Sequence, residues 1–276
     1  MFKGTNASSG IGIGTARVVE EADLVIEKKT VADADAEVTR FKGALDKTMK
    51  DTEALAADLA TRVGEKEAEI LQGHLMLLMD PALTGEIENT IKGEKICSEF
   101  AVEMVCTMYA NVFAGMDDEL MQQRATDMRD IKTRMQRVLL GVDSVDIASL
   151  PEGSILVAKD LTPSMTAGIN PKNVTGIVTE LGGKTSHSAI LARALEIPAV
   201  VAVSDFLSEV KNGDFVILDG DAGVVYVNPD PEIEKEYTAK RDAFLAEKKE
   251  LEKYIGKPTT TRDGVTVELV ANIGKP

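Results

Sequence analysis

The sequence contains few residues that could form covalent cross-links or bind metal ions. It has two cysteines and two histidines among 276 residues. Cys97 and Cys106 lie on one apolar helical segment, at a spacing that matches neither a zinc site nor a redox CxxC pair. We therefore expect both cysteines to be buried thiols, and we expect no metal site in this chain.

Long apolar runs and an excess of basic residues are also missing. No stretch reaches the ~18 apolar residues of a membrane span, and the opening MFKGTNASSG has no basic region followed by an apolar run. The formal net charge is -15, whereas nucleic acids and anionic membranes are bound through basic surfaces. We expect a folded cytoplasmic protein that binds neither of them and suits a partner with a basic face.

A helical block fills much of the first half of the chain. From Asp33 to Gly141, apolar residues recur at helical spacing among charged ones. The pattern breaks at Asp80-Pro81, where Asp can cap a helix and Pro can begin one, and Gly141 can end the last helix. This block predicts an all-helical domain.

Segments rich in β-branched residues lie on both sides of the helical block. Residues 11–27 predict two short strands, and the GIGIG at 10–14 predicts a turn and the start of an edge strand. After Pro151, short β-rich runs separated by Gly and Pro predict an α/β domain. Because the opening strands cannot form a stable sheet alone, we expect them to join the later ones, with the helical domain as an insertion.

These patterns set the expected domain limits. We predict an α/β domain of residues 1–30 plus 142–230 and a helical domain of residues 31–141. Residues 231–256 begin with Pro and are dense in Glu and Lys, which predicts a solvated linker helix. Residues 257–276 look like a hairpin and the opening of a further strand, after which the sequence stops, so we expect a truncated protein.

One stretch carries the chemistry. Residues 176–203, GIVTELGGKTSHSAILARALEIPAVVAV, predict a strand, a Gly-Gly turn, a short helix that begins near His187, and a second strand. Glycines let backbone amides approach a ligand, and the first amides of a helix have no internal partners, so this junction predicts an anion site. Its predicted phosphate-binding residues are Gly182, Gly183, Lys184, Thr185, Ser186 and Ser188.

The position of His187 suits a phosphoryl acceptor. The positive end of the helix disfavours an imidazolium, which leaves a nitrogen lone pair free to attack phosphorus. Phosphoryl transfer needs positioning and stabilisation of charge on the phosphoryl oxygens, which amides and hydroxyls supply. The alternative is a capping or buried histidine in a polar helix cap. The glycine pair, the three hydroxyls and the strand-to-helix junction together favour the phosphoryl acceptor.

The segment GGKTSHSAILARALEIPAVV resembles the phosphohistidine signature of the enzyme I family, the phosphoenolpyruvate-protein phosphotransferases of the bacterial sugar phosphotransferase system. GHLMLLMDPAL, RATDMRDI and LTPSMTA also look like enzyme I segments, in the same order, and the resemblance covers residues 1–276. It implies a swivelling α/β phosphohistidine domain, an inserted helical-bundle domain and a linker helix.

The resemblance also implies roles for individual residues. His187 would accept phosphate from phosphoenolpyruvate and pass it to the small phosphocarrier protein HPr, in the first step of sugar uptake. Thr166, in LTPSMTA, matches the family threonine that hydrogen-bonds and orients the active histidine, although it could simply cap a loop. The docking surface for HPr maps to Glu65, His74, Met76, Leu77, Leu83 and Arg124. For its Met and Leu residues, burial in the bundle core is the alternative.

Members of this family continue into a barrel domain that binds phosphoenolpyruvate and magnesium and forms a homodimer, and VTVELVANIG resembles the opening of that barrel. We therefore expect a monomer that needs no cofactor itself and exchanges phosphate only with HPr. One alternative is the swivelling domain of a dikinase or a phosphoenolpyruvate synthase, which lacks such a helical insertion. Another is a non-catalytic adaptor whose helices bind a partner.

Overall fold

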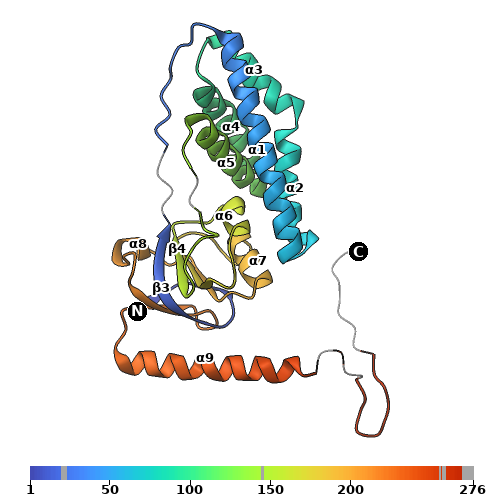
Figure 1. Ribbon diagram of the computed structural model, residues 1–276, viewed down its shortest axis with the longest axis vertical. Helices are drawn as coiled ribbons and strands as arrows, with labels where there is room; N and C mark the ends of the chain where they lie inside the picture. The colour runs from blue at the N-terminus through green and yellow to red at the C-terminus, as the bar shows by residue number, and fades with distance from the viewer. Residues whose placement is uncertain (20–23, 144–145, 255, 257–258, 269–276) are drawn as a thin grey trace.

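The computed structural model describes residues 1–19, 24–143, 146–254, 256 and 259–268. A bundle of helices stands on one side of an α/β domain, and a long helix runs along the opposite side of that domain (Figure 1). The predicted fold class is confirmed, because the bundle interrupts the sequence of the sheet domain between its third and fourth strands.

The sheet mixes parallel and antiparallel pairs. Its described strands follow the order β1-β8-β7-β3-β4-β5-β6-β2. Their bounds are Phe2–Lys3 (β1), Thr5–Ser8 (β2), Ile11–Val19 (β3), Ser154–Ala158 (β4), Val174–Thr179 (β5), Ala199–Val201 (β6), Phe215–Asp219 (β7) and Val224–Val227 (β8). Strand β3 pairs with β7 and β4, and β3, β4, β5 and β6 are mutually parallel. The opening strands do join the later ones, as expected.

The prediction for the glycine-rich opening was wrong in two respects. Residues 11–19 form a strand between β7 and β4, and not an edge strand. The second strand expected within residues 11–27 does not form in 24–27, and residues 20–23 lie outside the described ranges. A Cβ atom at Gly12 would lie 2.6 Å from the Thr175 carbonyl oxygen, and one at Gly14 would lie 2.1 Å from that of Gly153. The glycines are therefore required where β3 passes close to other backbone.

The bundle consists of α1 to α5 within the described residues. Their bounds are Ala34–Arg62 (α1), Glu65–Leu78 (α2), Pro81–Glu94 (α3), Ser98–Ala114 (α4) and Glu119–Leu140 (α5). Phe41, Ile87 and Ile131 are fully buried in its core, which also includes the thiol of Cys106. Cys97 is buried too, and both cysteines are free, as expected.

The helix ends lie where the capping residues predict them, with one exception. Asp80 Oδ1 accepts a hydrogen bond from the Ala82 N–H at 2.8 Å, and Gly141 ends α5 in the left-handed region at a φ of +65°. The break between α1 and α2 was not predicted. It occurs at Gly64, whose φ of +152° ends the first helix although the apolar pattern continues across it.

Four further helices complete the described elements. They are Pro163–Ala167 (α6), His187–Ala194 (α7), Phe206–Glu209 (α8) and Pro231–Glu252 (α9). Helix α9 is mostly exposed and is anchored by the buried Tyr237, whose ring lies 5.3 Å from that of Tyr226. No helix among the described residues is long and apolar enough to cross a membrane.

The domain limits named above stay predictions. Of the expected barrel opening at 257–276, residues 257–258 and 269–276 lie outside the described ranges. Within 259–268, Thr260 and Thr266 form an isolated antiparallel bridge.

The N-terminal end of α1 is tied to α4 through charged groups. The Glu37 carboxylate accepts a 2.6 Å hydrogen bond from the Ser98 N–H and a 2.7 Å bond from Arg40, which also binds Glu99. Burial raises the pKa of Glu37, but the hydrogen bonds from Arg40 and Ser98 together outweigh it and leave that pKa below its usual 4.5. The ionised form is therefore favoured by folding.

We expect Glu37→Gln to lower the free energy of unfolding at about pH 7 by about 1–3 kcal/mol, because a charged hydrogen-bond acceptor is lost. A depressed folded-state pKa contributes stability above pH 4.5, and this stability disappears as the pH falls through that pKa. The difference between variant and wild type should thus shrink in acid. Urea unfolding followed by circular dichroism at about pH 7 and about pH 3.5 measures it. Glu86→Gln, at an exposed site on α3, is the control; a difference that does not change with pH would contradict this account.

Candidate functional site

The loop between β5 and α7, residues 180–186, leaves the carboxyl end of a buried strand. Gly182 adopts a φ of +102°, which glycine tolerates better than any other residue. The start of the loop is fixed at Leu181, whose N–H donates to the Lys159 carbonyl at 2.8 Å and whose carbonyl accepts from Thr179 Oγ1 at 2.6 Å. The strand, glycine turn and helix therefore follow one another as the sequence predicts.

Ser186 joins the loop to α7. Its hydroxyl donates to the Gly183 carbonyl at 2.8 Å and accepts from the Ala189 N–H at 3.3 Å, which caps the helix. The buried Ser188 hydroxyl lies 2.9 Å from that of Ser186. Lys184 and Thr185 are exposed at the tip of the loop. The predicted phosphate-binding residues are thus brought together around the first turn of α7.

His187 is the first residue of α7 and is half-buried. Within the described part of the chain, its ring has no hydrogen bond or ion pair, so both nitrogens are available to a ligand. The N-terminal end of α7, with its free N–H groups and partial positive charge, lies beside it. This arrangement offers a nucleophilic nitrogen next to donors for an anion.

Asp160 lies near His187 and was missed by the sequence analysis. Partial burial raises the pKa of the Asp160 carboxyl, while a 2.8 Å bond from the Leu161 N–H and the charge of a protonated His187 oppose the rise. Asp160 follows β4, and the His187 loop follows its parallel neighbour β5. Because carboxyl ends of adjacent parallel strands meet at one edge, the strand order contained the signal.

Thr166 lies on α6, which packs against α7. Its side chain is fully buried, and its hydroxyl donates to the carbonyls of Thr162 and Pro163, each at 3.0 Å. No hydrogen bond joins it to His187 among the described residues. Since its hydrogen is used within α6, the Thr166 oxygen can serve His187 only as an acceptor.

The bundle and the α/β domain meet at α6 and α7 (Figure 1). One apolar cluster contains residues from both domains, namely Ala56, Leu59, Leu71, Ala167 and Leu191. Its Leu191 lies one turn after His187 on α7, and its Leu71 lies on α2. The helix that carries His187 and the helix to which partner docking was assigned therefore contribute to one apolar cluster, in which Ala167 of α6 also takes part.

The six predicted docking residues differ in exposure. Met76 is 67% exposed on α2, whereas Leu83 is 3% exposed and belongs to the bundle core. Glu65 is exposed, and Leu77 and Arg124 are half-buried. His74 is fully buried, with Nε2 3.3 Å from Asp127 Oδ1. In this structure His74 and Leu83 do not present their side chains to a partner, and the docking role of the others stays a prediction.

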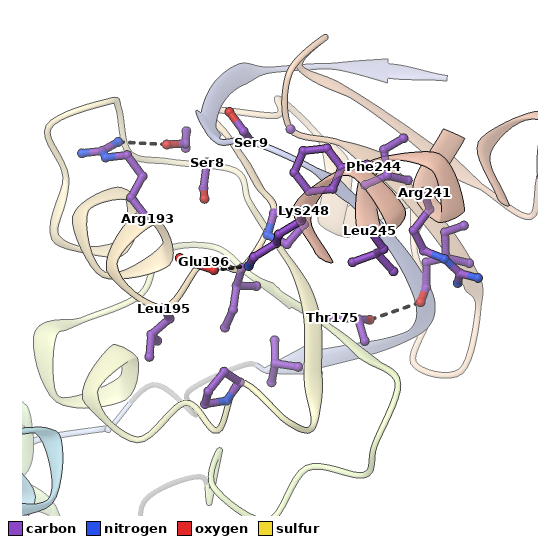
Figure 2. Close-up of a pocket in the computed structure, with 18 of the residues that line it drawn as sticks. Ser8, Ser9, Thr175, Arg193, Leu195, Glu196, Arg241, Phe244, Leu245 and Lys248 are labelled. Carbon is purple, nitrogen blue, oxygen red and sulfur yellow. Dashed lines mark hydrogen bonds and ion pairs between the residues drawn. The ribbon is translucent and has the colours of Figure 1, made fainter. Parts of the chain in front are cut away.

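A cavity of about 630 Å³ lies away from His187, between α9 and the edge of the sheet. Figure 2 shows Phe244 and Leu245 of α9 on one side, and Lys248 paired with Glu196. Arg193 of α7 reaches toward β2 on another side. No group of three or more His, Cys, Asp or Glu side chains is placed to hold a metal ion in the described ranges.

Comparison with known proteins gives this arrangement a context. Residues 3–124 match the family described as PEP-utilising enzyme, N-terminal, and residues 150–223 match PEP-utilising enzyme, mobile domain. An NMR solution structure of the Enzyme I (nEIt) protein is 40% identical, with a TM-score of 0.77, and the match covers 89% of this chain and all of that one. The chain belongs to the enzyme I family. The dikinase alternative is set aside.

Other members of the enzyme I family agree. The phosphoenolpyruvate-protein phosphotransferases of Bacillus sp. (strain S) and Bacillus subtilis are 44% and 42% identical over 99% and 100% of this chain. The match covers 47% and 48% of those two proteins, so the chain spans about half the length of the curated relatives it matches. The N-terminal domain of Enzyme 1 - Nitrogen has a TM-score of 0.58 at 26% identity, over 87% of this chain and 98% of that one.

Adjacent glycines of the loop allow a matched test of its geometry. We expect Gly182→Ala to lower the free energy of unfolding by about 1–3 kcal/mol, because alanine is strained at a φ of +102°. Gly183→Ala should have little effect, since its φ is not positive and a Cβ there meets nothing within 4 Å. Urea unfolding compares the two. Equal stabilities would contradict a loop fixed by Gly182.

Proposed function

We propose that this chain acts as the N-terminal half of a phosphoenolpyruvate-protein phosphotransferase. In this role, His187 accepts a phosphoryl group and passes it to HPr. The observation that carries the proposal is an imidazole without a partner among the described residues, half-buried at the start of α7 behind a glycine-rich loop. The family membership supports the same assignment.

The chemistry needs one free lone pair. A ring nitrogen of His187 attacks phosphorus, the bond from phosphorus to the donor breaks, and the electron pair of that bond leaves with the donor. The other ring nitrogen keeps its hydrogen, for which the Thr166 oxygen is the proposed acceptor. The amides of residues 182–185 and the exposed Lys184 and Thr185 would bind the phosphoryl oxygens, whose negative charge needs fixed donors.

Phosphoenolpyruvate and magnesium would bind to the part of the whole protein that this chain does not span. Magnesium prefers several oxygen ligands, and the described residues offer no such group. The described residues therefore do not fit the ion, and no step of the proposed transfer involves it. Phosphorylated HPr, running the transfer in reverse, is the donor this chain can use.

The proposed docking surface centres on α2. Exposed Met76 and half-buried Leu77 near the end of α2 form an adaptable apolar patch, and exposed Glu65 at the start of the same helix adds negative charge. The formal net charge of -15 would steer a basic partner toward it. Because Leu191 of α7 and Leu71 of α2 belong to one apolar cluster, a partner seated on α2 would approach the side of the α/β domain that carries His187.

Transfer to this chain can be measured directly. We expect incubation with phosphorylated HPr to add the mass of one phosphoryl group to the wild type, and to add nothing to His187→Gln. Intact-mass spectrometry at neutral pH reads the result. The other histidine provides the control, since His74→Gln should still take up phosphate if it folds. Phosphate that remains in His187→Gln, or none in the wild type, would overturn the proposal.

Docking can be separated from transfer with two methionines. We expect Met76→Lys to weaken binding of unphosphorylated HPr by about tenfold or more, because a charge enters the apolar patch. Met108→Lys, on α4 and 48% exposed, is the matched control and should bind as the wild type does. NMR titration of HPr measures both. Equal weakening by the two variants would place the docking surface elsewhere, and binding without any phosphate transfer would support the adaptor alternative.

A further inference from the structure

Arg193 connects three parts of the α/β domain. It lies near the end of α7, where a cation is favoured by the helix dipole. Its Nη2 donates to the Lys184 carbonyl at 3.0 Å, and its Nη1 donates to the Ala7 carbonyl of β2 at 2.8 Å. Figure 2 shows the side chain reaching across from α7 toward the β2 side of the cavity. One guanidinium thus holds the His187 loop and a strand at the edge of the sheet.

The Ala7 carbonyl is available because β2 contains a bulge. Strand β2 pairs with β6 as Asn6 with Val200 and then Ser8 with Ala199, so Ala7 is an extra residue without a partner in the ladder. A bulge leaves such a residue unpaired and changes the direction of its groups. Arg193 satisfies the carbonyl that the bulge releases.

The Lys184 carbonyl lies in the middle of the loop. The loop is fixed at its start through Leu181 and at its end through Ser186. Between these points lie Gly182, Gly183, Lys184 and Thr185, and glycines give this segment a wide choice of conformations. Among the described residues, Arg193 supplies the one hydrogen bond to the Lys184 carbonyl.

We propose that Arg193 is a positioning residue for phosphoryl transfer, which holds the backbone amides of residues 182–185 in the conformation that receives the phosphoryl group. Catalysis of this kind depends on donors that are already in place when charge develops. Arginine suits the task because its planar fork binds two acceptors in fixed directions, which a lysine ammonium does not reproduce. The inference rests on the proposed function of His187.

The test compares Arg193→Lys, Arg193→Met and a control, Arg241→Lys. Arg241 lines the same cavity but pairs with its neighbour Asp242, so it does not reach the loop. Transfer from phosphorylated HPr is measured as kcat and KM, and amide chemical shifts and hydrogen exchange of residues 182–185 are recorded on the unphosphorylated chain. We expect both Arg193 variants to lose about tenfold to a hundredfold in kcat, with KM changed less than about twofold. In both variants the amide chemical shifts of residues 182–185 should change and their hydrogen exchange should become faster. Arg241→Lys should match the wild type in the kinetics and in these amide signals.

Each outcome decides a separate point. Full activity and unchanged loop amides in Arg193→Met would overturn the inference. Full activity in Arg193→Lys alone would also overturn it, because charge would then suffice without the two-acceptor geometry. A loss of kcat with unchanged loop amides would assign Arg193 to some other role. If the wild type accepts no phosphate, the proposed function of His187 fails, and the loop amides still show whether Arg193 positions the loop.

Discussion

The hydrogen bonds that the bundle makes to α6 determine how the two domains face each other. Arg62 of α1 donates to the carbonyls of Ala167 at 2.5 Å and Ile169 at 2.7 Å, where α6 ends. At the other end of α6, Asp130 of α5 accepts from the Ser164 N–H at 3.0 Å and from its hydroxyl at 2.7 Å. Both ends of this short helix are thus held by the bundle, while its flank packs on α7.

These hydrogen bonds would let the proposed docking helix and the proposed phosphoryl acceptor, which lie on different domains, serve one reaction. The Asp130 side chain is 3% exposed and its bonds to Ser164 are partly buried, which strengthens them. The buried His74 ring lies on the bundle side of the same carboxylate, with Nδ1 3.8 Å from Asp130 Oδ2. The His74 side chain is therefore buried beneath α2 and does not contribute to the exposed surface of that helix.

The sequence predicted the structure best where that structure depends on contacts between residues close together in the sequence. The strand, the glycine turn, the capping Ser186 and the start of α7 lie within a few residues of one another, and their pattern was sufficient to predict this local structure. Apolar periodicity likewise found the bundle, but it runs through Gly64 without a break, so it could not separate α1 from α2. The position of His187 at a domain contact depends on Leu71 and Leu191, which are distant in sequence.

The remaining differences between prediction and structure concern the exposure of side chains and contacts between residues that are far apart in the sequence. A resemblance assigns a role to a sequence position, but whether Leu83 faces a partner or the core depends on how α3 packs in the bundle. The Arg193 bond to Ala7 joins residues that are 186 positions apart in the sequence, and the bulge that makes it possible is a property of strand pairing. Asp160 became recognisable only when the order of β4 and β5 was known.

The central place of β3 has a consequence during synthesis. Residues of β3 pair with β7, which leaves the ribosome roughly 200 residues later, or about 10–40 s later at typical rates. The helical bundle, whose contacts are complete much sooner, can fold while the opening segment waits without partners. An unpaired strand is a hazard for aggregation, and glycine is a poor strand former. Gly12 and Gly14, which the finished sheet needs for close approach, would also make the waiting segment a weaker template for pairing with other nascent chains.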